Sequence, residues 1–212
     1  MAFEISEFLH LRPFVYHVTD RANLPRLQTD RGMRPAESWL ADAKRRDLLG
    51  TWRPDSTALP LDGGVVVLKD QKPLIEANTL LTGGWTFGDF VTYLNRHVFF
   101  WPGRADGPIG PGSRLLQHYE AEGPAVLRLP TAELLAVNSS VAPLFCAFNS
   151  GSPRCQHGER VPRGPNLFTS ADRFPRRASQ VVELTFAAEI RLPASTELRA
   201  DDGWVSLFEA GG

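Results

Sequence analysis

The segment 14–19 carries polar side chains in a stretch that otherwise suits the interior of a protein. Its aromatic and β-branched residues predict a buried strand. Because side chains alternate along a strand, His17 and Thr19 point to one face, whereas Tyr16 and Val18 point to the other. A histidine in such a strand is either a hydrogen-bonded core residue or part of a binding pocket. The threonine on the same face favours the pocket.

A second polar residue interrupts the apolar segment 179–192, which alternates as a strand does. Glu183 lies there between Val182 and Leu184. A carboxylate buried without a partner is energetically expensive, so this one must be exposed, paired or functional. The residues alone leave a solvated strand face and a functional carboxylate equally open. In a functional site, a carboxylate stabilises a developing positive charge or deprotonates a nucleophile.

The long segment 149–178 is rich in glycine, proline and arginine, and loops of this length tend to be functional or disordered. Asn149 and Ser150 open it, and small polar residues suit a turn or a close backbone approach to a ligand. Its arginines are Arg154, Arg160, Arg163, Arg173, Arg176 and Arg177. The chain carries 23 basic and 24 acidic residues, so only this local patch offers an anionic substrate an evident electrostatic partner.

The elements that must position these residues follow from hydrophobic spacing, caps and turn residues. The predicted helices are one from Asp20 to near Gly32, one starting at Pro35, one capped by Thr86 and Asp89, and one stopping near Gly123. The further predicted strands cover 65–68, 98–101 (ended by Pro102 and Gly103), 125–129 and 144–148. This order predicts an α+β fold, and the absence of GxGxxG and GxxxxGK[ST] argues against Rossmann and P-loop sites.

The bulk properties predict a single domain over residues 1–212 with a loosely packed tail at 194–212. The chain is 42% hydrophobic, which suffices for a core at this length. The two cysteines are too few for a disulfide framework, and no ligand set has zinc spacing. The N-terminus lacks the pattern of a signal peptide, and no stretch approaches the length of a membrane span. We therefore expect a cytoplasmic protein without a resident metal or a membrane partner.

Several motifs together point to a known group of proteins. The run Tyr16–Thr19 followed by Asn23-Leu24-Pro25 resembles the opening of the DarT-type DNA ADP-ribosyltransferases. The chain looks closer still to an uncharacterised bacterial domain family distantly related to them. That likeness rests on Phe99–Gly103, Asn149–Arg154 and Pro162–Pro165, and it covers nearly the whole chain.

The resemblance implies the split, mixed or antiparallel β core of ADP-ribosyltransferases, with helices packed around it and NAD in a central cleft. His17 would contact a ribose hydroxyl with support from Thr19, and Asn23 would lie near the adenine. Glu183 would be the catalytic carboxylate, with His17 beside it. Phe99 and Lys69 would complete the NAD site. The characterised enzymes carry an arginine ahead of the aromatic strand, and Lys69 is the nearest candidate for that position in this chain.

The implied activity is transfer of ADP-ribose from NAD to a nucleic acid or a protein, as in a toxin. Residues 149–178 would form the substrate loop, with Asn149, Ser150, Arg154 and Arg163 contacting the acceptor. Cleavage of the nicotinamide–ribose bond develops an oxocarbenium-like charge that a carboxylate stabilises. Three other readings stay open: a non-catalytic nucleotide- or nucleic-acid-binding module, an NAD glycohydrolase, and a structural or toxin–antitoxin interaction protein.

Overall fold

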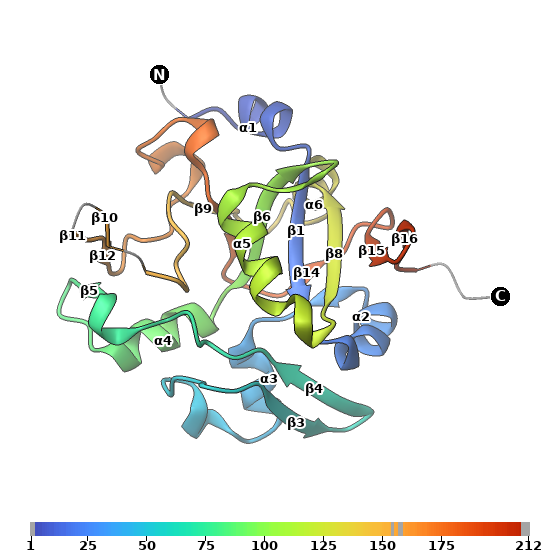
Figure 1. The fold of residues 1–212 in the computed structure, drawn as a ribbon, viewed down its shortest axis with the longest axis horizontal. Coiled ribbons are helices and arrows are strands. Elements are labelled where there is room, and N and C mark those ends of the chain that lie inside the picture. The colour runs from blue at the N-terminus through green and yellow to red at the C-terminus, as the bar shows by residue number, and fades with distance from the viewer. Residues whose placement is uncertain (1–2, 154, 157–158, 209–212) are drawn as a thin grey trace.

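The structure is a computed structural model that describes residues 3–153, 155–156 and 159–208. Its centre is an antiparallel sheet with the strand order β16-β15-β8-β1-β6-β13-β9, and β7 pairs with β6 at one end (Figure 1). The strands are β1 (Phe14–Thr19), β6 (Val98–Arg104), β7 (Gly107–Pro108), β8 (Ala125–Pro130), β9 (Leu144–Cys146), β13 (Glu183–Phe186), β15 (Glu197–Ala200) and β16 (Gly203–Ser206).

Helices and four small two-stranded sheets surround this sheet. The α-helices are α1 (Ile5–Leu11), α2 (Leu24–Asp30), α3 (Ala36–Asp42), α4 (Phe87–Asn95), α5 (Gly110–Tyr119) and α6 (Thr131–Val137). The short 3-10 helices are Arg21–Asn23, Arg46–Leu48, Glu76–Asn78, Glu120–Glu122, Ala171–Arg173 and Ala178–Gln180. The small sheets pair β3 (Thr57–Leu61) with β4 (Gly64–Leu68), β2 (Gly32–Met33) with β14 (Ile190–Arg191), β5 (Leu80–Leu81) with β12 (Pro162–Arg163), and β10 (Cys155–Gln156) with β11 (Glu159–Arg160). The predicted α+β class is confirmed.

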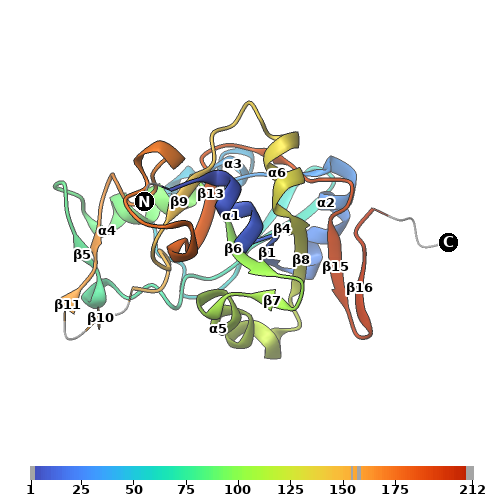
Figure 2. The ribbon, with the colours of Figure 1, turned by 90° about the horizontal axis from the view of Figure 1, so that it is seen from above.

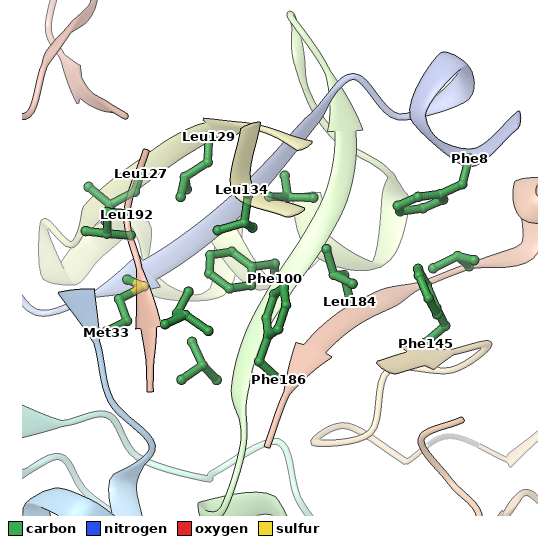
Figure 3. Close-up of a cluster of buried hydrophobic side chains, with 14 of the residues drawn as sticks. Phe8, Met33, Phe100, Leu127, Leu129, Leu134, Phe145, Leu184, Phe186 and Leu192 are labelled. Carbon is green, nitrogen blue, oxygen red and sulfur yellow. The ribbon is translucent and has the colours of Figure 1, made fainter. Parts of the chain in front are cut away.

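Two hydrophobic layers hold the helices against the sheet. The helices α1 and α6 lie on one face, and α5 lies on the other (Figure 2). The larger cluster, on the α1 and α6 side, joins Phe8 and Leu134 to Phe100, Phe145 and Phe186 from the sheet (Figure 3). On the α5 side, a smaller cluster is built from Val18, Trp101 and Tyr119, with Leu115 and Leu116 packed against it. The alternation of side chains along β1 and β6 therefore serves two cores at once.

The strands β1 and β6 pair over only part of their length. The residues Phe14–Tyr16 pair with Trp101–Gly103, and the rest of β6 pairs with β13, Val98–Phe100 lying opposite Leu184–Phe186. Because β6 changes partners midway, β1 and β6 part from His17 onward. This opening in the sheet is what positions the site described below.

The strand β6 runs through Pro102 and Gly103, which were predicted to end it. Proline costs little at this position because its missing N–H is not needed, and its carbonyl accepts a hydrogen bond from the N–H of Ile109 (2.9 Å). Gly103 allows β7 to fold back closely, since a Cβ there would meet the carbonyl oxygen of Gly107 and stand 2.6 Å from the Cα of Pro108. The two residues therefore shape a tight return of the chain.

Replacing Gly103 by alanine is expected to destabilise the protein. The added methyl group would press on backbone atoms of β7 and on the ring of Tyr16, 2.7 Å away, and neither can yield freely. Overpacking of this kind costs about 1–3 kcal/mol in the free energy of unfolding. Urea denaturation checks the value, with Gly151→Ala as the control because no atom lies within 4 Å of a Cβ built at Gly151. Equal stability of the two variants would contradict this packing.

The strand predicted at 65–68 is only half-buried. It belongs to β4, which forms a hairpin with β3. Val66 and Leu68 pack with Trp39 and Leu59 in a separate small cluster, whereas Val65 is 46% exposed. A run of four apolar residues does not distinguish a strand covered on both faces from one covered on a single face.

The segment after Pro193 is more tightly held than the loosely packed tail that the sequence predicts at 194–212. The strands β15 and β16 form a hairpin that extends the main sheet beyond β8, and Leu207 is buried. Arg128 of β8 holds this hairpin by an ion pair with Glu197 of β15 (2.6 Å) and by stacking over Trp204 of β16. These contacts hold the segment as far as 208, and residues 209–212 lie outside the described part.

The long segment 149–178 is partly packed into the molecule. Phe168 and Phe174 are buried in two different hydrophobic clusters, and β12 attaches the middle of the segment to β5. Within the described part of the chain, no helix is long and apolar enough to cross a membrane.

Candidate functional site

A cavity of about 280 Å³ lies where β1 and β6 part. His17 and Val18 point to opposite faces of β1, and both line it. The β3–β4 hairpin and α3 contribute Val66 and Trp39 to its walls, and β13 contributes Glu183. In Figure 1, α3 and the β3–β4 hairpin lie below the lower ends of β1 and β6. The opening in the sheet thus brings residues from distant parts of the sequence together.

His17 is fixed in one tautomer by its surroundings. Its Nδ1 lies 2.8 Å from the carbonyl oxygen of Phe99, which can only accept, so Nδ1 carries the hydrogen. Burial lowers the pKa of His17, although this hydrogen bond opposes the effect, so the ring is neutral at physiological pH. Its Nε2 is then an acceptor, able to receive a hydrogen bond from a ligand hydroxyl at the cavity wall.

Asn23 lines the cavity, but its amide is committed to the protein. Its Nδ2 donates to the hydroxyl of Thr19 (2.8 Å) and to the carbonyl of Val67 (2.9 Å). Its Oδ1 accepts from the N–H of Val67 (2.8 Å). The side chain therefore pairs with β4 as a strand would and fastens the hairpin to the end of β1. The predicted cofactor residues Thr19 and Asn23 both reach the cavity, and Asn23 also holds one wall in place.

Glu183 is the buried carboxylate of the site, with 1% of its surface exposed. Its strand β13 lies between β6 and β9, so both strand edges are covered. Oε1 accepts a hydrogen bond from the backbone N–H of Ser150 (3.0 Å), while Oε2 has no hydrogen-bond partner among the described residues. Burial raises the pKa of Glu183 to about 7, with Ser150 and Arg163 opposing the rise. Near neutral pH this group can both accept and give up a proton.

The opening of the long segment reaches the cavity, but none of its described arginines lines it. Asn149 and Ser150 line the cavity beside Glu183. Arg163, which was predicted to contact substrate, is 2% exposed, does not line the cavity, and donates to the carbonyl of Asn149 (3.1 Å). The composition of a segment shows that it is charged, but not whether each charged side chain points toward the cavity or away from it. Arg154 lies outside the described residues.

Lys69 and Phe99, for which the resemblance implies NAD contacts, both line the cavity. Lys69 is held against the wall, since its ammonium group pairs with Glu122 and lies 4.2 Å from the centre of the Tyr119 ring. The ring of Phe99 packs edge-on against Phe168 at 5.7 Å. Phe99 thus offers a fixed apolar surface, whereas the charge of Lys69 is already partly neutralised.

Arg53 is a site residue that the sequence analysis missed. It lines the cavity at 8% exposure, donates from Nε to the carbonyl of Lys69 (3.2 Å) and from Nη1 to Oδ1 of Asn95 (3.0 Å). Burial lowers its pKa to about 10, so it remains a cation at neutral pH. Its planar guanidinium lies beside the backbone of Lys69. It follows Trp52 in a stretch without periodicity, so the sequence carried no signal for it.

Trp101 contributes a buried donor that also went unnoticed in the sequence. The indole lines the cavity, and its Nε1 has no hydrogen-bond partner within the described part of the chain. Buried indole N–H groups are ordinarily paired. Together with Oε2 of Glu183, this leaves one unpartnered donor and one unpartnered acceptor on the walls of the same cavity.

Cationic side chains outnumber carboxyl groups among the described residues that line the cavity, but Arg34 is paired with Asp42 (2.7 Å) and Lys69 with Glu122, which leaves Arg26 and Arg53 for an anionic ligand. Four cationic side chains line the cavity, and they are Arg26, Arg34, Arg53 and Lys69. The lining carboxyl groups are Glu183 and Asp70, and Asp70 accepts a hydrogen bond from Tyr119 (3.2 Å). Among the residues that the structure describes, no group of three or more histidines, cysteines, aspartates or glutamates could hold a metal ion.

Comparison with known proteins places the chain in one family. Neither the curated proteins nor the solved structures contain a match to it. A family model described as a family of unknown function, DUF7002, does match it over residues 13–196. That span includes every cavity-lining residue named above and most of the 212 residues, so the chain belongs to the DUF7002 family.

Proposed function

We propose that the protein is an NAD-dependent ADP-ribosyltransferase that transfers ADP-ribose to a macromolecular acceptor. One observation carries the proposal: Glu183 lines the same cavity as His17 and Arg53, and one oxygen of its buried carboxylate has no hydrogen-bond partner among the described residues. The β core that opens between β1 and β6 also agrees with the split sheet that the resemblance to DarT-type enzymes implies. NAD is both the source of the transferred group and the ligand of the cavity.

The residues divide the work of binding. Nε2 of His17 accepts a hydrogen bond from a ribose hydroxyl, since its Nδ1 is already bound to Phe99. The guanidinium of Arg53 faces the pyrophosphate, because a planar fork suits phosphate oxygens. Phe99 lies along the same wall as an apolar surface for a ring. This arrangement matches a ligand that has hydroxyl groups, phosphates and aromatic rings.

The carboxylate performs the chemical step. The bond between the ribose C1′ and the nicotinamide nitrogen breaks, and nicotinamide leaves with the electron pair. The resulting oxocarbenium-like charge is stabilised by the ionised Glu183. A nucleophile of the acceptor attacks C1′ and gives its proton to the same carboxylate. A pKa of about 7 allows Glu183 to be ionised for the first event and to take up the proton in the second.

The proposal is tested by nicotinamide release from NAD, measured by chromatography with wild-type protein. The protein is incubated alone and with single-stranded DNA, RNA or protein extract, and melting is followed with and without NAD. We expect a higher melting temperature with NAD and nicotinamide release that one acceptor accelerates. Absence of both effects would overturn the proposal. A thermal shift without release would indicate a binding module, and release without labelled acceptor would indicate an NAD glycohydrolase.

The role as a toxin is tested separately in growing bacteria. Expression of the wild-type chain is expected to arrest growth, because an active transferase would modify a macromolecule of the host. Expression of His17→Ala or Glu183→Gln at the same level should relieve the arrest. Normal growth with an active wild-type enzyme would contradict the toxin role and leave the transferase chemistry standing.

Replacing Trp101 by phenylalanine is expected to weaken NAD binding about two- to tenfold, while the ligand-free protein loses some packing volume but no hydrogen bond. The change removes one buried donor that has no partner in the described structure, so the empty protein loses no hydrogen bond. A hydrogen bond to the ligand is worth about 0.5–1.5 kcal/mol. Calorimetric titration with NAD and thermal melting measure the two effects. Unchanged affinity would show that the indole N–H does not meet the ligand.

A further inference from the structure

Arg163 is a buried cation without an acidic neighbour at ion-pair distance. It is 2% exposed, and no ion pair involving it occurs among the described residues. Its Nη1 donates to the carbonyls of Val161 (3.2 Å) and Pro162 (3.3 Å), and its buried Nε has no partner within the described parts of the chain. Burial of a charge in such surroundings is costly. A general packing role does not explain why a cation stands here.

The guanidinium group of Arg163 is hydrogen-bonded to the Asn149–Ser150 turn, which faces Glu183. Nη2 of Arg163 donates to the carbonyl of Asn149 (3.1 Å). The next residue, Ser150, points its backbone N–H at Oε1 of Glu183 (3.0 Å). One face of the guanidinium also lies 5.3 Å from the centre of the Phe148 ring, just before the turn. Arg163 therefore contacts both the turn, at the carbonyl of Asn149, and the residue before it, at the ring of Phe148.

The other end of Arg163 is anchored just as firmly. Its strand β12 pairs in parallel with β5, and the carbonyl of Arg163 accepts a hydrogen bond from the N–H of Thr82 (2.9 Å). Gly164 follows without room for a Cβ, since one would meet Thr82. The side chain thus links the strand β12, which is fixed by its pairing with β5, to the turn at Asn149.

We propose that Arg163 is the positioning residue of Glu183, holding the Asn149–Ser150 turn so that the Ser150 N–H meets the carboxylate from behind the cavity. This inference rests on the proposed function, because it assigns Arg163 a part in the reaction without contact to the substrate. It replaces the role of substrate-binding arginine that the sequence suggested.

The electrostatics point the same way. The pKa of Glu183 is raised by burial and lowered by Ser150 and by the charge of Arg163. Two other titratable groups lie near it: His17, which lines the same cavity, and Cys146, its pairing partner on β9, whose thiol pKa is raised by burial and then by Glu183. From β6, the neighbouring residues opposite β13 are Val98, Phe99 and Phe100, which do not titrate. Arg163 is thus the cation that favours the ionised carboxylate.

The test follows the titration of Glu183 in the ligand-free protein by carbon-13 NMR of its Cδ, with Glu183→Gln identifying the resonance. We expect Arg163→Met to raise the pKa of Glu183 by about one unit or more, since both a nearby cation and an aligned N–H favour the ionised form. Arg163→Lys keeps the charge but loses the planar fork, so a smaller rise is expected. Arg176→Met is the matched control, because Arg176 is exposed and stacks on the same Phe148 ring.

Nicotinamide release supplies the second readout. The acidic limb of its pH profile should move upward in Arg163→Met and remain in place in Arg176→Met. An unchanged Glu183 titration in folded Arg163→Met overturns the inference, and if that variant does not fold, an unchanged titration in Arg163→Lys does so. Wild-type protein that releases no nicotinamide would defeat the proposed function, whereas the NMR titration would still decide whether Arg163 positions Glu183.

Discussion

Replacing Glu183 by glutamine is expected to reduce nicotinamide release from NAD by about a thousandfold. The neutral amide would not be able to stabilise the oxocarbenium-like charge or take up the proton of the nucleophile, and loss of a general base alone costs about 10²–10⁴-fold. The amide keeps an oxygen for the N–H of Ser150 and has nearly the same shape as the carboxylate, so the fold is retained. Steady-state assays at pH 8 measure the loss.

The control for this variant is Glu7→Gln. Glu7 is an exposed carboxylate on α1, outside the residues that line the cavity, so nicotinamide release should match that of the wild type. Retention of more than about a tenth of the activity in Glu183→Gln, with NAD binding intact, would remove the carboxylate from the chemical step.

The same substitution is expected to stabilise the protein at pH 8 by about 3 kcal/mol. The pKa of Glu183 is about 7 in the folded protein, whereas its ordinary value is 4.5. Below pH 4.5 both states are protonated and Glu183 costs nothing. Between these values the unfolded chain loses its proton first, so stability falls as the pH rises, and the full cost persists above pH 7. Glutamine carries no charge and avoids this cost.

Urea denaturation at pH 5 and pH 8 measures this difference. Wild type and Glu183→Gln should differ in free energy of unfolding by less than about 1 kcal/mol at pH 5 and by the full amount at pH 8. Glu7→Gln should follow the wild type at both values, because its carboxylate is exposed. A wild-type protein that loses no more stability than Glu183→Gln over this range would show that Glu183 titrates as an ordinary carboxylate. Residues of functional sites often lower the stability of the folded protein, so their replacement can raise it.

The sequence revealed those site residues that interrupt an apolar pattern. His17 and Glu183 stood out because a strand period makes a polar group in a core position conspicuous. Their positions in one cavity follow from the order of strands β1, β6 and β13, which pair across more than 80 residues of sequence. Long-range pairing of this kind leaves no local signal, so the cavity itself was inferred from resemblance and not from the residues.

Residues in irregular segments were harder to place. Arg53 lies in a stretch without periodicity, and only its hydrogen bonds to Asn95 and to the carbonyl of Lys69 bring it to the cavity. Arg163 was predicted to contact substrate because its loop is locally basic. Its strand β12 is paired with β5, and its side chain is buried. Asn23 was expected to meet the cofactor, yet its amide is used to fasten the β3–β4 hairpin. Direction of a side chain in a loop is set by tertiary contacts.

The central claim is that the cavity between β1 and β6 is an NAD site, and calorimetric titration of NAD into Glu183→Gln tests it most directly because this variant does not consume the ligand. The matched protein is the double variant with His17→Ala, which loses the Nε2 acceptor at the cavity wall. We predict saturable binding of one NAD per chain, weakened about tenfold or more in the double variant. Absence of binding, or equal binding by both proteins, would contradict the assignment of this cavity.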